Sequence, residues 1–154
     1  MKKKTFIWLV ILLGIVLAAL YAYKEYTRVN PDLSHVRPDV KIGYNELLDE
    51  YSANDSLANA KYLGKIIQTS GPLKEVEISG GGYYTLILGD NQGLSSIRCA
   101  IDTSHNETAS QLKAGSTIMV RGECTGFKKN ELLGENLGSD VELNRSVIIL
   151  QNNK

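Results

Sequence analysis

An uncharged, apolar run from Thr5 to Tyr23 constrains the fold of this chain more than any other feature. A helix of that length spans about 28 Å at about 1.5 Å per residue, which is close to the hydrocarbon thickness of a bilayer. Helical structure is required there because backbone polar groups must bond to one another where no water is present. Residues 1–23 are therefore predicted to form an N-terminal transmembrane anchor, with the membrane as partner.

The charges that flank this run predict its orientation. Three lysines precede it, at positions 2–4, whereas Lys24 and Arg28 after it are diluted by Glu25. Positive flanks tend to stay in the cytoplasm, so we expect a cytoplasmic N-terminus and a domain on the extracytoplasmic side. A cleaved signal peptide is the alternative. The length of the apolar run and the scarcity of small residues before a cleavage site favour a retained anchor.

The net charge beyond the run lowers the expectation of nucleic-acid binding. The chain of 154 residues has 17 basic and 17 acidic residues, and three lysines belong to the N-terminal segment. The remainder therefore holds 17 − 3 = 14 basic and 17 acidic residues, a net charge of −3. Phosphate backbones are usually bound by basic surfaces, so nucleic acid is an unlikely partner.

The segment between the apolar run and the expected strands has two parts of different composition, residues 24–43 and residues 44–62. Residues 24–43 are polar, lack periodicity and contain Pro31 and Pro38, which predicts an extended spacer. Residues 44–62 have apolar side chains at helical spacing, with a polar interruption. They predict a helical lead-in, as one interrupted helix or two short ones, with Asn45 or Asn54 as a cap.

Residues 63–150 have the composition and alternation of strands separated by glycine-rich turns. The first strand is expected to bend at Gly71-Pro72, and Gly80 to Gly82 are expected to form a turn. A short helix over 106–114 is expected between the third and fourth strands. The five expected strands are Leu63–Ser79, Tyr83–Leu88, Ser96–Asp102, Thr117–Phe127 and Val141–Leu150.

This order of elements predicts a mainly β fold, a five-stranded OB-fold-like barrel with a short helix between strands three and four. Several segments also resemble the tRNA_anti-like family of OB-fold proteins. These segments are 59–65, 68–71, 97–101, 115–126, 141–143 and 147–148. The resemblance implies the fold, but it implies little about activity, because many members are exported or membrane-anchored bacterial proteins of unknown role. Unlike the lipoprotein-like members, this chain has an apolar anchor, and no tRNA-contacting residue carries over.

The two cysteines, Cys99 and Cys124, lie on inward positions of the third and fourth expected strands. They are either two buried thiols acting as small hydrophobes or a disulfide. A disulfide would need the two Cα atoms within about 7 Å of each other across the interior.

Candidate ligand contacts are the aromatic and basic residues near the strands and loops that OB-folds use for binding. Tyr83 and Tyr84 are consecutive in a strand, so one should face inward and the other outward. Phe127, Lys128 and Lys129 lie near the connection between the last two strands. Outward aromatic rings there can stack on bases or sugar rings.

Catalytic and metal-binding patterns are not recognised in the sequence. His35 and His105 are isolated, and no nucleophile and base stand at a known spacing. We therefore expect no cofactor, no metal and no catalysis. The leading prediction is a noncatalytic, membrane-anchored binding module of the cell envelope, whose partner is a protein or a saccharide. The alternative is a single-stranded nucleic-acid-binding OB-fold protein, and an enzyme ranks last.

Overall fold

The structure is a computed structural model that describes residues 3–26, 32–132 and 135–149. The chain divides into two compact units, Met1–Pro31 and Asp32–Lys154. In the first unit, helix α1 spans Lys3–Tyr26, so the expected helical conformation is confirmed. Among the described residues, no helix combines the length and the hydropathy needed to cross a membrane.

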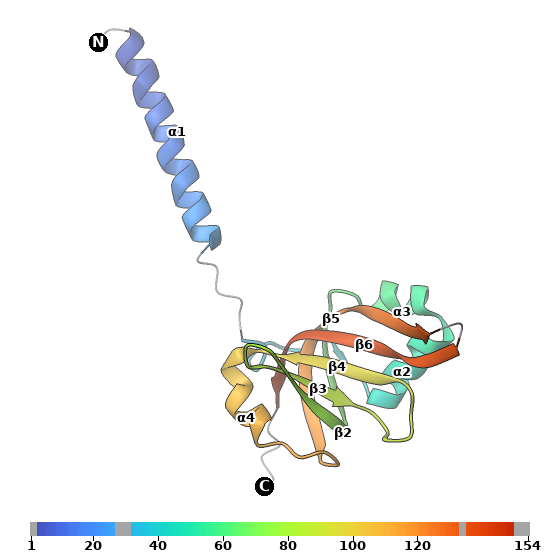
Figure 1. Ribbon diagram of the computed structural model, residues 1–154. Helices are drawn as coiled ribbons and strands as arrows, with labels where there is room; N and C mark the ends of the chain where they lie inside the picture. The colour runs from blue at the N-terminus through green and yellow to red at the C-terminus, as the bar shows by residue number, and fades with distance from the viewer. Residues whose placement is uncertain (1–2, 27–31, 133–134, 150–154) are drawn as a thin grey trace. The chain divides into compact units, whose positions relative to one another are not determined.

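The second unit is built on a mixed sheet of six strands (Figure 1). Its neighbours are paired in the order β1-β2-β3-β4-β6-β5, and a further pairing between β2 and β5 closes the last five strands into a ring. Strands β4 and β6 run parallel, as the third and fifth strands of an OB-fold do. The strands are β1 (Val40–Lys41), β2 (Ile66–Ser79), β3 (Tyr83–Leu88), β4 (Ser96–Ile101), β5 (Thr117–Leu132) and β6 (Glu135–Ile148).

Strand β2 belongs to both sides of the ring because it bends where the sequence predicts. Residues 66–72 pair with β5, whereas residues from Leu73 onward pair with β3. The register shifts between Leu73 and Glu75, directly after Gly71-Pro72. The bend lets one long strand contribute to two pairings, as in other OB-folds.

The core lies inside the ring and is extended by a helical hairpin. Alternate residues of the strands point inward and are fully buried, among them Leu86, Ile97 and Val141. Helix α2 (Tyr44–Ala53) and helix α3 (Asp55–Tyr62) add Tyr51 and Tyr62 to the same cluster. The predicted helical lead-in is thus two short helices. The side chain of Asn54 accepts a 3.0 Å hydrogen bond from the Leu57 amide, and so caps α3.

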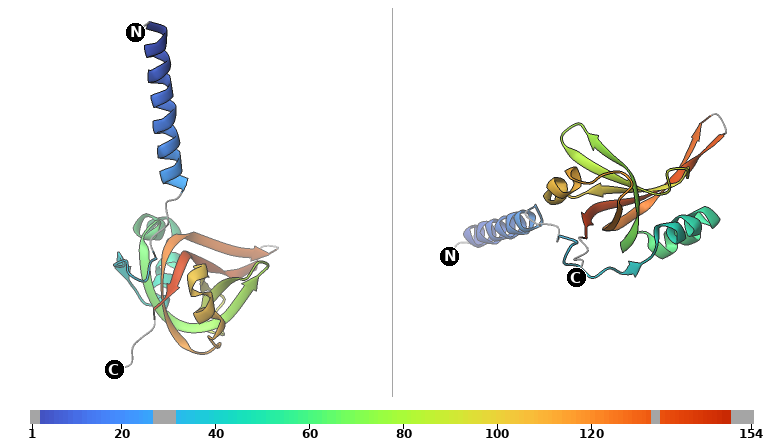
Figure 2. Two further views of the ribbon diagram at one scale, coloured as in Figure 1. Left: turned by 90° about the vertical axis from the view of Figure 1, so that its left-hand side faces the viewer. Right: turned by 90° about the horizontal axis from the view of Figure 1, so that it is seen from below.

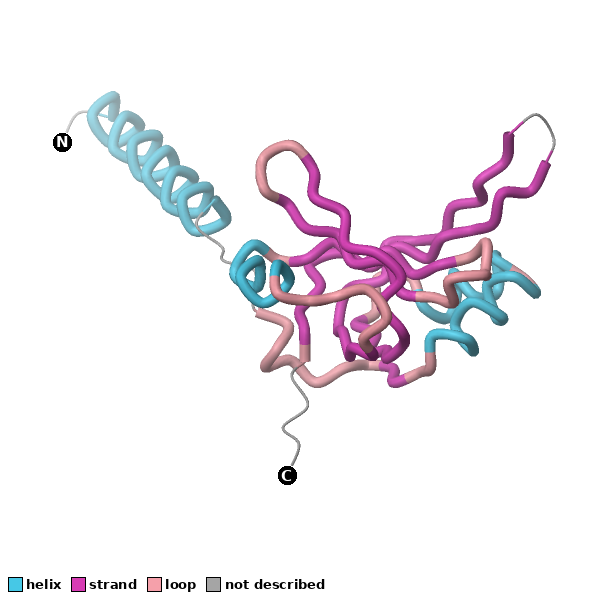
Figure 3. Tube along the Cα trace, turned by 60° about the horizontal axis from the view of Figure 1, so that its bottom comes forward, coloured by secondary structure: helices cyan, strands magenta, loops and turns pink. Residues whose placement is uncertain are grey.

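The hairpin of α2 and α3 lies at one end of this unit, and the helical segment between β4 and β5 lies at another (Figures 1 and 2). The segment between β4 and β5 holds a short 3-10 helix, η1 (Thr103–His105), followed by α4 (Asn106–Ser110). The predicted helix between strands three and four is confirmed, although it ends at Ser110 and not at residue 114. The hairpins β2–β3 and β5–β6 project from the same side of the unit (Figure 3).

The hairpin β5–β6 is longer than the sequence indicates. Strand β5 continues to Leu132 and β6 begins at Glu135, whereas the expected strands end at Phe127 and begin at Val141. Residues 128–140 are polar and contain two glycines, a composition typical of a loop. Pairing between Lys129 and Ser139 nevertheless continues the ladder beyond the core.

The predicted spacer over residues 24–43 differs from the structure from Asp32 onward. Leu33 is buried, β1 pairs in parallel with β2, and Asp39 accepts a 2.8 Å hydrogen bond from the Ile66 amide. The Arg121 guanidinium donates to the carbonyls of Leu33, Ser34 and Val36. A single buried leucine and a two-residue strand give too little periodicity to be recognised in the sequence, so the compact unit begins earlier than predicted.

Candidate functional site

The candidate site is a pocket of about 420 Å³ on the outer face of the sheet. It lies where the start of β3 and the end of β4 come close to the middle of β5 and β6. The exposed ring of Tyr83 forms one wall, and polar side chains form much of the remainder. The lining residues are Tyr83, Ala100, Ile101, Asp102, Thr103, Glu123, Thr125, Asn144 and Arg145.

A local break in β6 brings the side chains of Asn144 and Arg145 to the pocket. The register between β5 and β6 shifts between Arg121 and Glu123, and Arg145 has a φ of 52°, which non-glycine residues seldom adopt. Gly122 makes the break sterically feasible, because a Cβ there would collide with the Ser146 hydroxyl. Strained backbone and irregular pairing of this kind are enriched at binding and catalytic sites.

The electrostatics of the pocket are set by two carboxylates and one guanidinium. Arg145 Nη1 lies 3.3 Å from Glu123 Oε2, so these two lining side chains form an ion pair. Hydrogen bonds from the Ser104 side chain and amide hold the pKa of Asp102 below its ordinary value. Asp102 therefore stays ionised, and the pocket presents hydrogen-bond acceptors beside a charged donor.

The neighbouring part of the same face is also acidic. The pairings Glu75–Ile87, Ile87–Arg98 and Arg98–Glu142 form one continuous row across the sheet, in which Ile87 is buried. The Arg98 guanidinium is engaged by the carboxylate of Glu77, with 3.3 Å between Nη1 and Oε1. This contact, strengthened by the charge of Glu142, raises the pKa of Arg98. A phosphate group approaching Arg98 would therefore compete with a carboxylate already in place.

Of the predicted ligand contacts, Tyr83 is the one that lines this pocket. Its side chain is exposed, whereas Tyr84 packs against the core, so the predicted alternation of the two rings is confirmed. Phe127 is a different case. Its ring stacks on Tyr51 of α2, with 5.0 Å between centroids and 14° between planes. Phe127 therefore stabilises the contact between the helices and the sheet and does not face the pocket.

The two predicted lysines lie on the β5–β6 hairpin, away from the Tyr83 pocket. Lys128 pairs in register with Asp140, and Lys129 Nζ lies 3.0 Å from Asp55 Oδ2 of α3. The Asp55 carboxyl has a lowered pKa, chiefly because of the hydrogen bond from Lys129. Lys129 therefore joins the hairpin to α3.

Cys99 and Cys124 are buried free thiols, and the disulfide alternative is not formed in this structure. Burial raises the pKa of Cys99 to about 12 and also raises that of Cys124. Cys124 Sγ lies 3.3 Å from Tyr51 Oη. Both residues act as small core side chains. Within the described ranges, no group of three or more His, Cys, Asp or Glu side chains is arranged to hold a metal ion.

Six polar pocket residues, at positions 102, 103, 123, 125, 144 and 145, were not predicted from the sequence because they come from separate strands and loops. Asp102 follows a strand, and Glu123 lies in the middle of another. Asn144 and Arg145 give the one sequence pattern that could have indicated the site, because they interrupt the apolar alternation of the last expected strand. A polar interruption in a strand is typical of a bulge.

Comparisons with known proteins agree with this architecture. A lipoprotein of Klebsiella pneumoniae, to which nucleic-acid binding is attributed, superposes with a TM-score of 0.54 at 16% identity. The alignment covers 71% of this chain and 92% of that chain. Asparaginyl-tRNA synthetase of Entamoeba histolytica gives a TM-score of 0.44 at 17% identity, over 73% of this chain and 24% of that chain. The similarity to the Klebsiella lipoprotein, at 16% identity, shows the fold alone.

Sequence comparison identifies the family directly. No curated protein sequence matches the chain. The tRNA_anti-like family model matches residues 1–136, which include the N-terminal helix and most of the strands that form the ring. With the OB-like order of strands described above, this match confirms the resemblance seen in the sequence. The chain belongs to the tRNA_anti-like family.

Proposed function

We propose that the domain is a noncatalytic binding module that holds a neutral, hydroxyl-rich ligand, such as a saccharide, in the Tyr83 pocket. The observation that carries this proposal is the composition of the pocket. It combines an exposed aromatic ring with carboxylate, amide and guanidinium groups in a cavity of about 420 Å³. A sugar ring has an apolar face for the aromatic ring and hydroxyls that can donate to Asp102 and Glu123. OB-folds use this kind of face for oligosaccharides as well as oligonucleotides.

The charge of the site favours a neutral ligand over a polyanion. Two carboxylates and one guanidinium line the pocket, and Glu75, Glu77 and Glu142 lie on the same face of the sheet. Nearby carboxylates repel a phosphate backbone, whose binding depends mainly on basic side chains. A saccharide carries no such penalty.

The test is glycan binding by the full chain in detergent micelles, first on a glycan array and then by titration with the glycan retained. Tyr83→Ala should weaken binding by about tenfold or more, because an aromatic stacking contact is worth about 1–3 kcal/mol. Tyr83→Phe should retain binding. Leu94→Ala serves as the matched control, because Leu94 is an exposed apolar residue outside the pocket. Binding that is unaffected by Tyr83→Ala would contradict the proposed site.

Single-stranded nucleic acid is a second candidate. It is supported by the nucleic-acid binding attributed to the Klebsiella lipoprotein and by the lysines of the β5–β6 hairpin. A labelled oligothymidylate at low ionic strength distinguishes the two candidates. Salt-dependent binding that weakens in Lys128→Gln would favour nucleic acid, whereas a saccharide site predicts no salt-dependent binding of the oligonucleotide.

The proposal includes attachment of the module to a membrane through α1, with the domain on the extracytoplasmic side of the envelope. This part rests on the sequence, namely the apolar run from Thr5 to Tyr23 and the lysines before it. Large apolar side chains of α1, such as Leu13 and Leu17, are about 60% exposed in the isolated helix, and a bilayer would cover them.

Cell fractionation tests the attachment. The full chain should stay in the membrane pellet after alkaline extraction, and Leu13→Lys combined with Val16→Lys should release it. Protease added to spheroplasts should digest the domain, whereas protease added to intact cells should not. Release of the unaltered chain by alkaline extraction would rule out the anchor. Protection of the domain from protease in spheroplasts would show that the domain lies on the cytoplasmic side.

A further inference from the structure

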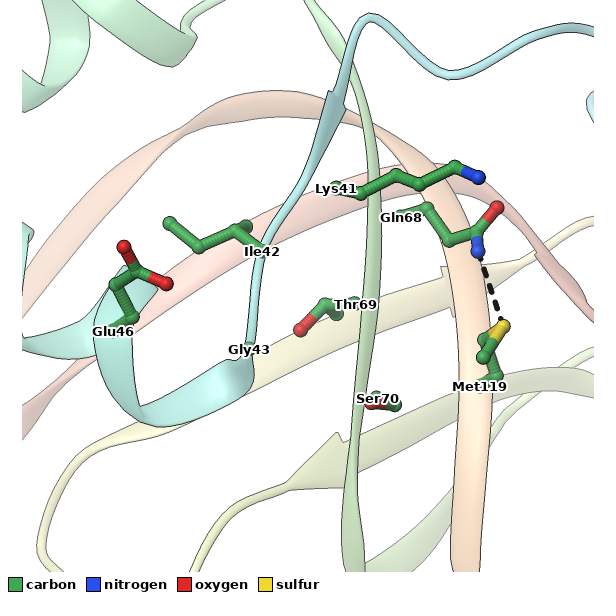
Figure 4. A pocket seen from close by; sticks show the side chains of 8 residues that line it. All are labelled: Lys41, Ile42, Gly43, Glu46, Gln68, Thr69, Ser70 and Met119. Carbon is green, nitrogen blue, oxygen red and sulfur yellow. Dashed lines mark hydrogen bonds between the residues drawn. The ribbon is translucent and has the colours of Figure 1, made fainter.

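A second pocket, of about 300 Å³, lies on a different flank of the sheet, where β1, β2 and β5 meet the start of α2 (Figure 4). It shares no residue with the Tyr83 pocket. Its polar lining comes from Lys41, Glu46, Gln68, Thr69 and Ser70. The proposed function assigns no role to these side chains.

The Thr69 hydroxyl is the first sign that this pocket takes a ligand. Thr69 is 1% exposed, and its Oγ1 has no hydrogen-bond partner among the residues that the structure describes. Figure 4 shows this side chain between the ribbon of β2 and the segment Ile42–Gly43, on the pocket side. A buried hydroxyl without a partner is costly, and a ligand that accepts or donates one hydrogen bond would remove that cost.

The N-terminus of α2 is the second sign. This helix has 10 residues, with Glu46 in its first turn, and its N-cap, Gly43, lines the pocket and has no side chain that could accept a hydrogen bond from the first amides. The first amides of a helix have no acceptor within the helix, and the helix dipole adds partial positive charge there. A carboxylate or a similar anion is the natural acceptor for such amides.

The charged side chains narrow the chemistry of the ligand. Figure 4 shows Lys41 and Glu46 at opposite ends of the pocket, with Gly43 and Thr69 between them. A simple anion would be attracted by Lys41 and repelled by Glu46, and a simple cation would experience the reverse. A molecule that carries both charges satisfies both ends.

Gln68 gives the pocket a fixed wall. Its Nε2 donates to Met119 Sδ at 3.1 Å, and its Oε1 accepts from Arg121 Nη2 at 2.8 Å. Both ends of the Gln68 side-chain amide are thus held in place, so this residue shapes the wall of the pocket. Ligand binding is left to the Thr69 hydroxyl, the charges of Lys41 and Glu46, and the first amides of α2.

We propose that this pocket binds a small zwitterion with an ammonium and a carboxylate a few bonds apart, as in a free amino acid or a dipeptide. The carboxylate lies at Gly43, before the first amides of α2 and on the side toward Lys41, and the ammonium lies against Glu46. The Thr69 hydroxyl forms a hydrogen bond with the part of the ligand between the two charges. This proposal does not depend on the saccharide assignment, because the two pockets are separate.

The experiment is an amide-resolved NMR titration of the ¹⁵N-labelled full chain in detergent micelles, with diglycine as the probe. Two matched compounds each lack one charge: N-acetylglycine is an anion and glycinamide is a cation. We expect saturable shifts of the amides of residues 43–46, Thr69 and Ser70 with diglycine. Binding of each matched compound should be weaker by about tenfold, the effect of losing one charge-assisted hydrogen bond. Equal binding of N-acetylglycine and diglycine would overturn the zwitterion assignment, and no saturable shift with any of the three would overturn the site.

Variants test the same contacts one at a time. Lys41→Gln and Glu46→Gln should each weaken diglycine binding severalfold, and Lys113→Gln, at an exposed position outside the pocket, should leave it unchanged. Thr69→Val keeps the shape of the side chain and should also weaken binding. An unchanged spectrum outside the pocket shows that each variant is folded. Unchanged affinity in both charge variants would contradict the proposal.

Discussion

The two cysteines illustrate how burial controls chemistry at single residues. Burial raises the pKa of Cys99 to about 12, and Cys124 is shielded in the same core. The thiolate is the reactive form, so both residues should be inert in the folded chain at about pH 8. We expect Ellman's reagent to detect no thiol in the native protein and two in the denatured, unreduced protein. Absence of thiol after denaturation without reductant would show that the cysteines are bonded.

Arg121 is expected to contribute more to stability than other surface arginines. Its guanidinium donates to three carbonyls of the segment 33–36 and to Gln68 Oε1. Arg121→Met should lower the free energy of unfolding by at least about 2 kcal/mol, because a single hydrogen bond to a charged group is worth about 1.5–3 kcal/mol. Urea denaturation measures the change. Arg37→Met is the control, since Arg37 is exposed, and an equal effect of both substitutions would refute the role of Arg121.

Predictions about single residues are confirmed where the position of the side chain depends on neighbouring residues in the sequence. The outward position of Tyr83 follows from strand alternation, and the cap at Asn54 follows from its place before a helix. The role of Phe127 could not be predicted in this way. Its partner, Tyr51, is distant in the sequence, and the stacking exists only because α2 packs against β5.

At the scale of elements, the polar contacts between α2 and α3 centre on one carboxylate, that of Glu50. Glu50 accepts 2.8 Å hydrogen bonds from Lys61 Nζ and Tyr62 Oη, and these contacts, the one from Lys61 first, hold its pKa below the ordinary value of 4.5. A carboxyl with a lowered pKa in the folded state stabilises the fold above its unfolded pKa, and this stability is lost as the pH falls.

This linkage gives a pH-dependent prediction. Urea denaturation of the full chain at a series of pH values should show stability falling below about pH 4.5, and Glu50→Gln should make that fall shallower. Asp49→Asn, an exposed carboxylate on the same helix, should leave the fall unchanged. Identical pH profiles of Glu50→Gln and the unaltered chain would show that the Lys61 contact does not stabilise the hairpin in solution.

The sequence predicts the elements of the core better than those outside it. Strands such as Tyr83–Leu88 alternate because one face is buried, and their expected bounds are confirmed. The extension of β5 and β6 past Lys128 has no such alternation, and β1 has only two residues. The Tyr83 pocket was accessible only through Tyr83 itself, because its polar residues meet through strand pairing between distant parts of the chain.

At the scale of the whole molecule, the boundary of the folded unit can be tested by truncation. A chain that begins at Asp32 should match the full chain in its urea midpoint, because the compact unit begins there. A chain that begins at Tyr44 loses buried Leu33, β1 and the acceptors of Arg121. It should be less stable by about 4 kcal/mol, from apolar burial and hydrogen bonds together. If the two truncated chains were equally stable, residues 32–43 would be a spacer that contributes nothing to the stability of the folded unit.

The closed ring of strand pairings also affects how copies of the domain behave when they are crowded together. Each of the five ring strands has a neighbour on both sides over the part that lies in the ring, so the backbone groups of that part are not available to a strand of another molecule. The strand at the end of the sheet order is β1, which is two residues long and closely preceded by Pro38. Short edges near proline are poor templates for intermolecular β pairing. In the ring and at β1, the domain thus leaves few backbone groups open to strand pairing between crowded copies.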